Sequence, residues 1–498
     1  MSDALRLLIL SRNPLIAIET TDEERASQRV REVALRLHLP VYDWSMTGGL
    51  RKYDTTREGV LGPILVSPGP PNAAVEHILH FPEKAVYLFR DLGPHCRDAN
   101  LHRTIRDFMN DQGNSGSTMI MVDALPLPDE IRRFTIRFDL DWPSEEELVE
   151  IVRNTFRRIK SENMRDVTSD ITRSEMNHLV QCLRGLTTRE VESVIASAIY
   201  DDYSLTGADL PRVVEAKRTL LGSTGCLENI SADFDADDIG GLDALKVWLR
   251  KRRKGFTPEA VEYGLESPRG VLMLGVAGCG KSLCAKVVAA DWHMPLLRLD
   301  PGMLFQKFIG ESESQLRRAL AQAEAMAPAI LWIDEIEKAF ASAASSSADG
   351  GLSKRMFGTL LSWMQDHRHP IFIIATANDI SALPPELMRK GRFDEVFFVD
   401  LPKEAARKQI FEIHLRRRKQ NPADFDLDEL ARAADGFGGS EIEQAVLSAM
   451  FSGFSAGEKL TTRHLLDEIK QTRPLSVLQR EQITELREWA RNRCVPAD

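Results

Sequence analysis

Short apolar runs alternate along the chain with longer amphipathic segments. These runs lie at residues 15–18, 40–44, 85–89, 119–122 and 134–140 in the first half, and at 270–274, 296–299, 330–333 and 371–376 in the second. Strands that alternate with helical segments predict a parallel sheet covered by helices. Helical patterns dominate from residue 145 to about 217. The predicted fold class is therefore α/β, with two sheet modules, and 498 residues leave room for both.

The two halves also share short motifs in the same order. Residues 38–41 (HLPV) resemble 293–296 (HMPL), and 185–186 resemble 436–437 in a similar helical context. Two further pairs fall in register, which indicates a tandem duplication. The alternative is that the halves share only their sheet class.

A glycine-rich loop, GVAGCGKS at residues 275–282, joins an apolar run to a helical segment. Its glycines let backbone N–H groups point inward as an anion site, behind which lies the positive end of a helix. Lys281 can then reach the outer phosphates, and the Ser282 hydroxyl can ligate Mg²⁺. A chance glycine loop is the alternative, but the full motif in this context favours ATP with Mg²⁺.

Two acids and an amide follow apolar runs of the second half. Asp334 and Glu335 end one run, and Asn378 follows the next. Asp334 is predicted to hold the magnesium, Glu335 to polarise the attacking water, and Asn378 to orient that water. At the matching places the first half has Ala26 instead of Lys281 and Arg90 instead of Asp334. The first module is therefore predicted to be a structural or docking domain that binds no nucleotide.

Further motifs carry a family resemblance. Residues 383–394 (LPPELMRKGRFD) resemble the second region of homology of the AAA ATPases, and the likeness extends over about residues 234–473, with DIGG at 238–241 and GFGGSE at 436–441. Residues 332–338, 361–365 and 393–402 are similar to the chloroplast-reading-frame (ycf-type) AAA family. The resemblance implies a P-loop AAA module with a helical lid, preceded by a degenerate AAA-like module.

The resemblance also implies site residues and an assembly. Arg389 and Arg392 would be arginine fingers for the neighbouring subunit of a homo-oligomeric ring, expected to be a hexamer. His414 would contact adenosine, or be an ordinary helix histidine. The predicted nucleotide-binding set is Ile239, Gly241, Gly275, Val276, Ala277, Gly278, Cys279, Gly280, Lys281, Ser282, Leu283, His414 and Gly439. Phe308, Ile309 and Gly310 would form a loop that grips a polypeptide in the channel, or else pack locally.

The predicted organisation follows these motifs. The boundaries are 1–143 for a degenerate AAA-like domain, 144–217 for a helical lid-like subdomain, 218–238 for a linker, 239–402 for the large AAA subdomain, 403–473 for its lid and 474–498 for a terminal helix.

Composition and charge narrow the partners. A net charge of -10 argues against a general nucleic-acid binder, although residues 250–254 and 416–419 are basic runs. Such runs on helices favour a solvated or subunit-facing surface.

The cysteines show no metal-ligand spacing, and Cys279 in the loop favours a reducing compartment. Its thiol is expected either to have a lowered pKa among inward-facing amides or simply to fit there. No apolar run is long enough for a signal peptide or membrane span, so the expected location is cytoplasmic.

The expected function is therefore ATP hydrolysis by a ring that remodels or threads a protein partner. One alternative is an ATP-controlled scaffold or regulator that binds a partner without translocating it. A nucleic-acid motor is a third. The sequence does not identify the partner.

Overall fold

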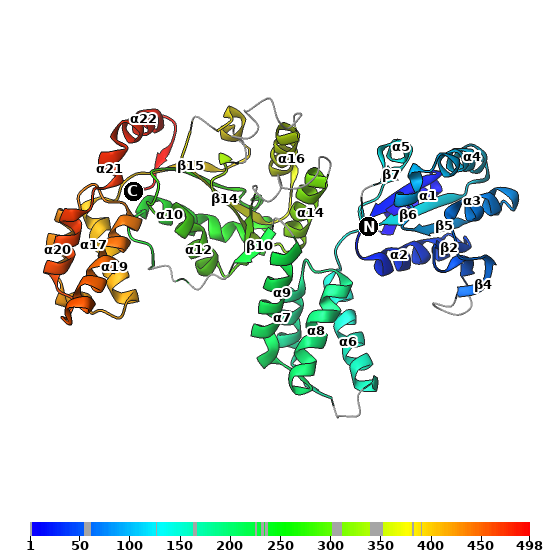
Figure 1. The fold of residues 1–498 in the computed structure, drawn as a ribbon, viewed down its shortest axis with the longest axis horizontal. Helices are drawn as coiled ribbons and strands as arrows, with labels where there is room; N and C mark the ends of the chain where they lie inside the picture. The colour runs from blue at the N-terminus through cyan, green and yellow to red at the C-terminus, as the bar shows by residue number, and fades with distance from the viewer. Residues whose placement is uncertain are drawn as a thin grey trace. The chain divides into compact units, whose positions relative to one another are not determined.

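The computed structural model describes residues 2–53, 61–125, 127–162, 167–224, 227–230, 234, 238–300, 311–338, 352–380, 383–389 and 391–498. They form two compact units (Figure 1). The first unit contains residues up to 176 together with 186–207, and the second contains 177–185 together with 208–498.

The first unit is built on a seven-stranded sheet in the order β4-β3-β2-β5-β6-β1-β7. Its strands are β1 (Leu15–Glu19), β2 (Val41–Ser45), β3 (Gly49–Tyr53), β4 (Leu61–Val66), β5 (Val86–Arg90), β6 (Thr118–Asp123) and β7 (Ile136–Arg137). Neighbours are parallel except at the β2–β3–β4 edge. Its helices are α1 (Ser2–Leu10), α2 (Glu23–Arg36), α3 (Pro71–His80), α4 (Ala99–Ser115) and α5 (Asp129–Arg132). Apolar residues alternate between two cores, one on each face of the sheet.

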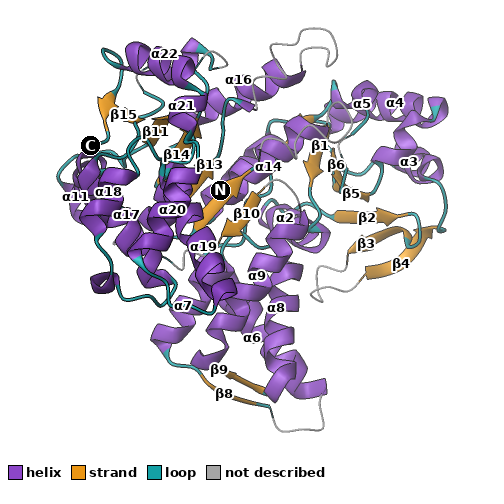
Figure 2. Ribbon diagram, turned by 60° about the vertical axis from the view of Figure 1, so that its left-hand side comes forward, coloured by secondary structure: helices purple, strands orange, loops and turns teal. Residues whose placement is uncertain are grey.

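Helices follow the first sheet: α6 (Glu145–Glu162), α7 (Arg173–Leu183), α8 (Thr188–Asp202) and α9 (Leu210–Thr224). Within the first unit, α6 packs on α8. Two short strands, β8 (Thr168–Asp170) and β9 (Ser204–Thr206), pair in parallel beside the ends of these helices (Figure 2).

The second unit repeats the central strand order. Its sheet runs β10-β12-β13-β14-β11-β15-β16, so β12-β13-β14-β11-β15 matches β2-β5-β6-β1-β7 of the first. The strands are β10 (Leu227–Ile230), β11 (Gly270–Gly275), β12 (Leu296–Leu299), β13 (Ala329–Ile333), β14 (Ile371–Ala377), β15 (Glu395–Val399) and β16 (Val495–Pro496). The helices beside it are α10 (Asp243–Arg253), α11 (Pro258–Glu262), α12 (Lys281–Trp292), α14 (Glu311–Ala325) and α16 (Leu352–Asp366). The α/β fold class and the degenerate first module are thereby confirmed.

A separate helical bundle, the lid, follows β15. It consists of α17 (Glu404–Arg417), α18 (Leu427–Ala433), α19 (Gly439–Ala456) and α20 (Thr462–Gln471), which share a core of their own beside α10 and α12 (Figure 1). After α21 (Leu475–Leu478) and α22 (Arg480–Ala490), the chain returns to the sheet as β16, parallel to β15. The sequence predicted only a helix in this last segment.

The segment predicted as a linker, residues 218–238, has regular structure in most of its described part. Residues 218–224 complete α9, and β10 pairs antiparallel with β12 at the sheet edge, with Leu227 buried. The low apolar content concealed an edge strand that buries only one side chain. The other predicted boundaries stay predictions. No helix in the described part of the chain is long and apolar enough to cross a membrane.

Candidate nucleotide-binding site

The glycine loop leaves β11 at Gly275 and enters α12 at Lys281. Two glycines are required by close contacts. Gly275 has a φ of 150°, and a Cβ there would lie 1.9 Å from the Val399 carbonyl oxygen on β15. Gly278 has a φ of 74°, and a Cβ would lie 2.2 Å from Ser440 Oγ at the start of lid helix α19. The loop is therefore confined between the sheet and the lid.

Lys281 occupies the centre of this loop. Its side chain is buried, and Nζ donates hydrogen bonds to the carbonyls of Gly275 at 2.8 Å and Val276 at 2.7 Å. Burial lowers the pKa of Lys281 to about 8, because desolvation disfavours the charged form. An ammonium that donates to two neutral carbonyls keeps its positive charge available for binding an anion.

The predicted acids meet the loop at the carboxyl end of β13. Asp334 Oδ1 accepts hydrogen bonds from Ser282 Oγ at 2.9 Å and from Thr376 Oγ1 at 2.6 Å. Thr376 also accepts from the Glu335 N–H at 3.0 Å. Glu335 has a φ of 49°, a left-handed conformation that costs a non-glycine residue about 1 kcal/mol. Such strain at a strand end, fixed by Thr376, is typical of functional sites.

Asn378 positions the Glu335 carboxylate. Its Nδ2 donates to Glu335 Oε1 at 3.0 Å, and Glu335 also pairs with Lys338. The Asn378 N–H in turn donates to Glu337 Oε1 at 2.9 Å. Glu337 is buried, and this burial raises the pKa of its carboxyl. Thr376 and Glu337 were not predicted as site residues, since only their tertiary contacts reveal that they hold these groups.

A cavity of about 440 Å³ lies above the loop and beneath the lid. The Ser440 N–H donates to the Gly278 carbonyl at 3.0 Å, which ties α19 to the loop. Of the predicted nucleotide-binding set, all members except Gly241, Gly275 and Val276 line this cavity, and the predicted catalytic and magnesium-binding residues Asp334, Glu335 and Asn378 line it as well. The lining residues are thus Ile239, Ala277, Gly278, Cys279, Gly280, Lys281, Ser282, Leu283, Asp334, Glu335, Asn378, His414 and Gly439. The volume and the mixture of backbone amides, apolar side chains and a few charged groups suit a nucleotide.

His414 reaches the other end of the cavity from α17. Its Nδ1 lies 3.7 Å from Glu443 Oε1, and burial lowers the pKa of the imidazole. Gly240 lines the cavity, whereas the N–H of Gly241 donates to Gln409 Oε1 at 2.9 Å, away from the lining. Ile239 and Gly241 both lie in the strip of residues 238–242, which leads into α10. Of these two predicted positions, Ile239 is therefore the one that faces the cavity.

Comparisons with known proteins agree with this geometry. Residues 271–401 match the ATPase family associated with various cellular activities (AAA). The AAA domain-containing protein ycf46 of Pyropia yezoensis is 35% identical over 491 residues, which cover 98% of this chain and 96% of that protein. The chain belongs to the ycf46 family of AAA ATPases. The ycf46 protein of Trieres chinensis is 34% identical over 494 residues, with 98% and 96% coverage.

The family extends over the first half and connects to more distant ATPases. Residues 1–140 match the N-terminal domain of SpoVK-like AAA ATPases, and residues 146–224 match their second domain. The proteasome-activating nucleotidase of Archaeoglobus fulgidus is 34% identical over 250 residues, which cover 48% of this chain and 63% of that protein. The second unit of this ycf46-type protein thus contains a nucleotide-binding AAA domain.

Two predicted groups lie elsewhere. Arg389 and Arg392 follow a short 3-10 helix, η5 (Pro385–Met388), and neither lines the cavity of its own chain. A role toward a neighbouring subunit stays a prediction for both. Phe308, Ile309 and Gly310 lie outside the described residues, and so does Lys390 between the two arginines.

The oxygen donors at the loop suit Mg²⁺. Ser282 Oγ and Asp334 Oδ1 are hard oxygen ligands 2.9 Å apart, and Mg²⁺ in nucleotide sites needs only one or two protein ligands besides phosphate and water. Among the described residues there is no group of three or more His, Cys, Asp or Glu side chains that could hold a metal alone. These two residues would therefore hold the ion together with the nucleotide.

The expectation of a lowered pKa for Cys279 is wrong. Burial raises the pKa of this thiol to about 12, and the nearby Lys281 charge only partly opposes the effect. The half-buried thiol lies beside the start of the lid: a Cβ on Gly438 would lie 3.7 Å from Sγ. Desolvation therefore dominates over the loop amides, which favours the alternative of a small residue that fits.

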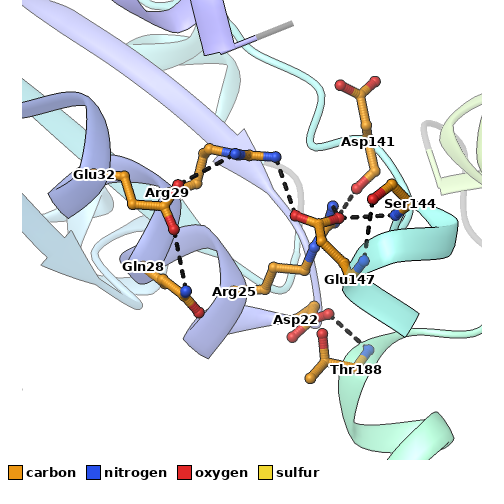
Figure 3. A network of polar contacts seen from close by, with 9 residues as sticks. All are labelled: Asp22, Arg25, Gln28, Arg29, Glu32, Asp141, Ser144, Glu147 and Thr188. Atoms are coloured by element: carbon orange, nitrogen blue, oxygen red, sulfur yellow. Dashed lines mark hydrogen bonds and ion pairs between the residues drawn. The ribbon is translucent and has the colours of Figure 1, made fainter. Parts of the chain in front are cut away.

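At the end of the first sheet that corresponds to the nucleotide site of the second, side chains form a network of ion pairs and hydrogen bonds (Figure 3). Arg25 and Arg29 of α2 pair with Glu147 at the start of α6, at 3.0 and 3.2 Å, and Asp22 accepts from the Thr188 N–H of α8 at 2.9 Å. Arg90, in the place of Asp334, pairs with Glu23 and with Asp43. Ala26 is fully buried. Side-chain charges here join the sheet module to its helices.

Proposed function

We propose that this protein hydrolyses ATP in the cavity beneath the lid and, as a homo-oligomeric ring, uses that cycle to remodel a protein partner. The observation that carries the proposal is the linked set Ser282–Asp334–Thr376–Glu335–Asn378 beside Lys281. It joins a phosphate-binding loop to a held carboxylate, which is the arrangement that phosphoryl transfer to water requires.

Each residue has a defined task in this mechanism. The N–H groups of the loop and the N-terminal end of α12 bind the phosphates. Lys281 moves its ammonium away from the Gly275 and Val276 carbonyls and toward the outer phosphates. Ser282 and Asp334 would hold Mg²⁺, which supplies charge neutralisation between the outer phosphates. Glu335, held by Asn378, accepts the proton of the attacking water. Lys338 must release Glu335 for this step, since the two are paired.

Ring assembly and partner remodelling are proposed from two other observations, the position of the two arginines and the names of related proteins. Arg389 and Arg392 do not line their own cavity, so their predicted contact with nucleotide requires a second copy of the chain. An arginine finger typically accelerates the reaction roughly 10³- to 10⁵-fold. Related AAA proteins include a proteasome-activating nucleotidase and a cell division cycle protein 48 homolog. Gripping of a polypeptide by Phe308 stays part of the proposal.

Complementation between two inactive variants tests hydrolysis and assembly together. Glu335→Gln should bind ATP but release phosphate about 10²- to 10⁴-fold more slowly than the parent. Arg392→Ala should also be slow, because its neighbour's site lacks the finger. In a mixed ring, an Arg392→Ala chain receives the arginine of a Glu335→Gln neighbour, so mixing should restore part of the turnover. Absence of turnover in the parent refutes hydrolysis, and failure of mixing refutes the shared site.

A further inference from the structure

The basic run at residues 416–419 lies at the end of α17, where its arginines have different surroundings. Arg416 is largely exposed and pairs with Glu412 one helical turn away. Arg418 pairs with Glu443 at 2.8 Å, beside His414. Arg417 points to the strip that leads into α10, where it meets Asp238. The three arginines therefore make separate contacts, and only Arg417 among them lines the cavity.

Arg417 and Asp238 form a two-pronged ion pair. Arg417 Nη2 lies 2.9 Å from Asp238 Oδ2, and Arg417 Nε donates to Asp238 Oδ1 at 3.2 Å. The Arg417 guanidinium also lies over the Phe234 ring, 5.0 Å from its centroid. Bidentate pairing and an aromatic platform fix a guanidinium more firmly than a single contact does. All three side chains line the cavity.

The pair joins the residues that lead into α10 to a helix of the lid. Asp238 begins a strip anchored to α10, since Lys246 Nζ donates to the Ile239 carbonyl at 2.6 Å. Arg417 belongs to lid helix α17. Between them Gly240 lies against α17, where a Cβ would come within 2.8 Å of Ile410. The ion pair lies at the partly exposed rim, with side-chain exposures of 33% for Arg417 and 24% for Asp238.

We propose that the Arg417–Asp238 pair is a latch that closes the cavity at its partly exposed rim and slows nucleotide release. This inference rests on the proposed nucleotide site and adds a residue pair that sets its exchange rate. A nucleotide that leaves past the strip requires the lid to separate from Asp238, which breaks the pair. Binding of the phosphates by the loop does not involve either side chain.

The test follows release of radiolabelled ADP from the full-length protein after a chase with excess unlabelled ADP. Arg417→Ala should release ADP about two- to fivefold faster than the parent, the effect expected for a partly exposed ion pair. Arg416→Ala, which removes a neighbouring arginine outside the latch, should release it at the parental rate. Raising the salt concentration should speed release from the parent more than from Arg417→Ala.

The double variant Asp238→Arg, Arg417→Asp exchanges the two charges of the ion pair. It distinguishes a latch from direct contact of either side chain with the nucleotide. A latch predicts slower release from the exchanged pair than from either single variant, with the unfolding temperature of each variant checked. Release from Arg417→Ala at the parental rate, or an exchanged pair as fast as the singles, overturns the latch alone. A parent protein that retains no ADP overturns the proposed function and with it this inference.

Discussion

Substitution of Gly278 by alanine tests how closely the phosphate loop depends on the lid. Alanine at a φ of 74° costs about 1 kcal/mol in backbone strain. Its Cβ would also lie 2.2 Å from Ser440 Oγ, so the serine must leave its rotamer or α19 must shift, at a cost of about 1 kcal/mol more. The sum is a loss of about 2 kcal/mol in the free energy of unfolding. Each kcal/mol lost should lower the unfolding temperature by about 2–4 °C.

Ser440→Ala separates the two contributions. The double variant removes Oγ, and the new Cβ then meets Ser440 Cβ at 3.3 Å, a close contact that small shifts can relieve. The backbone bond from Ser440 N–H to Gly278 remains available. Calorimetric unfolding and ATP affinity of the parent, both single variants and the double variant form a cycle. We expect a coupling of about 1 kcal/mol in favour of the double variant. Additive effects would refute the contact between loop and lid.

Two predictions concern the first unit. Burial raises the pKa of Asp123 to about 6, so the folded chain holds a proton that the unfolded chain has released, and stability falls as pH rises from about 4 to 6. Asp123→Asn should lose this dependence. In urea unfolding, the free energy of unfolding of Asp123→Asn minus that of the parent should therefore rise by about 1.4 kcal/mol between pH 5 and 7.5. A difference that does not change with pH contradicts the raised pKa of Asp123. Glu147→Arg places a third cation beside Arg25 and Arg29, and should speed amide exchange in α6, unlike exposed Glu146→Arg. Equal exchange in both variants would argue against the network of Figure 3.

The strands at the centre of both sheets could be predicted because they are buried on both faces. β13 is buried at every position, and a continuous apolar run that ends in two acids is readable without tertiary information. Edge strands lack this signal. β4 is exposed or half-buried throughout, and β16 has only two residues, so its pairing with β15 depends on where the chain returns. The apolar runs therefore revealed the parallel cores and the segment that contains edge strand β7, but missed the edge strands β4, β10 and β16.

The candidate site shows the same division. Loop glycines, Lys281 and the acids have fixed spacing along the chain, so the sequence predicts their proximity. Thr376 and Glu337 act through contacts across strand ends, and the raised pKa of Cys279 arises from burial, which depends on the folded surroundings of the loop. Arg417 appeared only as part of a basic run, because the partner that gives it a role lies in another segment.

The central claim is that the chain has one ATP site, at the loop of residues 275–282, and none in its first unit. Calorimetric titration of full-length Glu335→Gln with ATP and Mg²⁺ tests it most directly, because slow hydrolysis keeps the ligand intact. The account predicts about one ATP per chain, and no measurable binding once Lys281→Ala is added. Two sites per chain, or one site that survives Lys281→Ala, would contradict it.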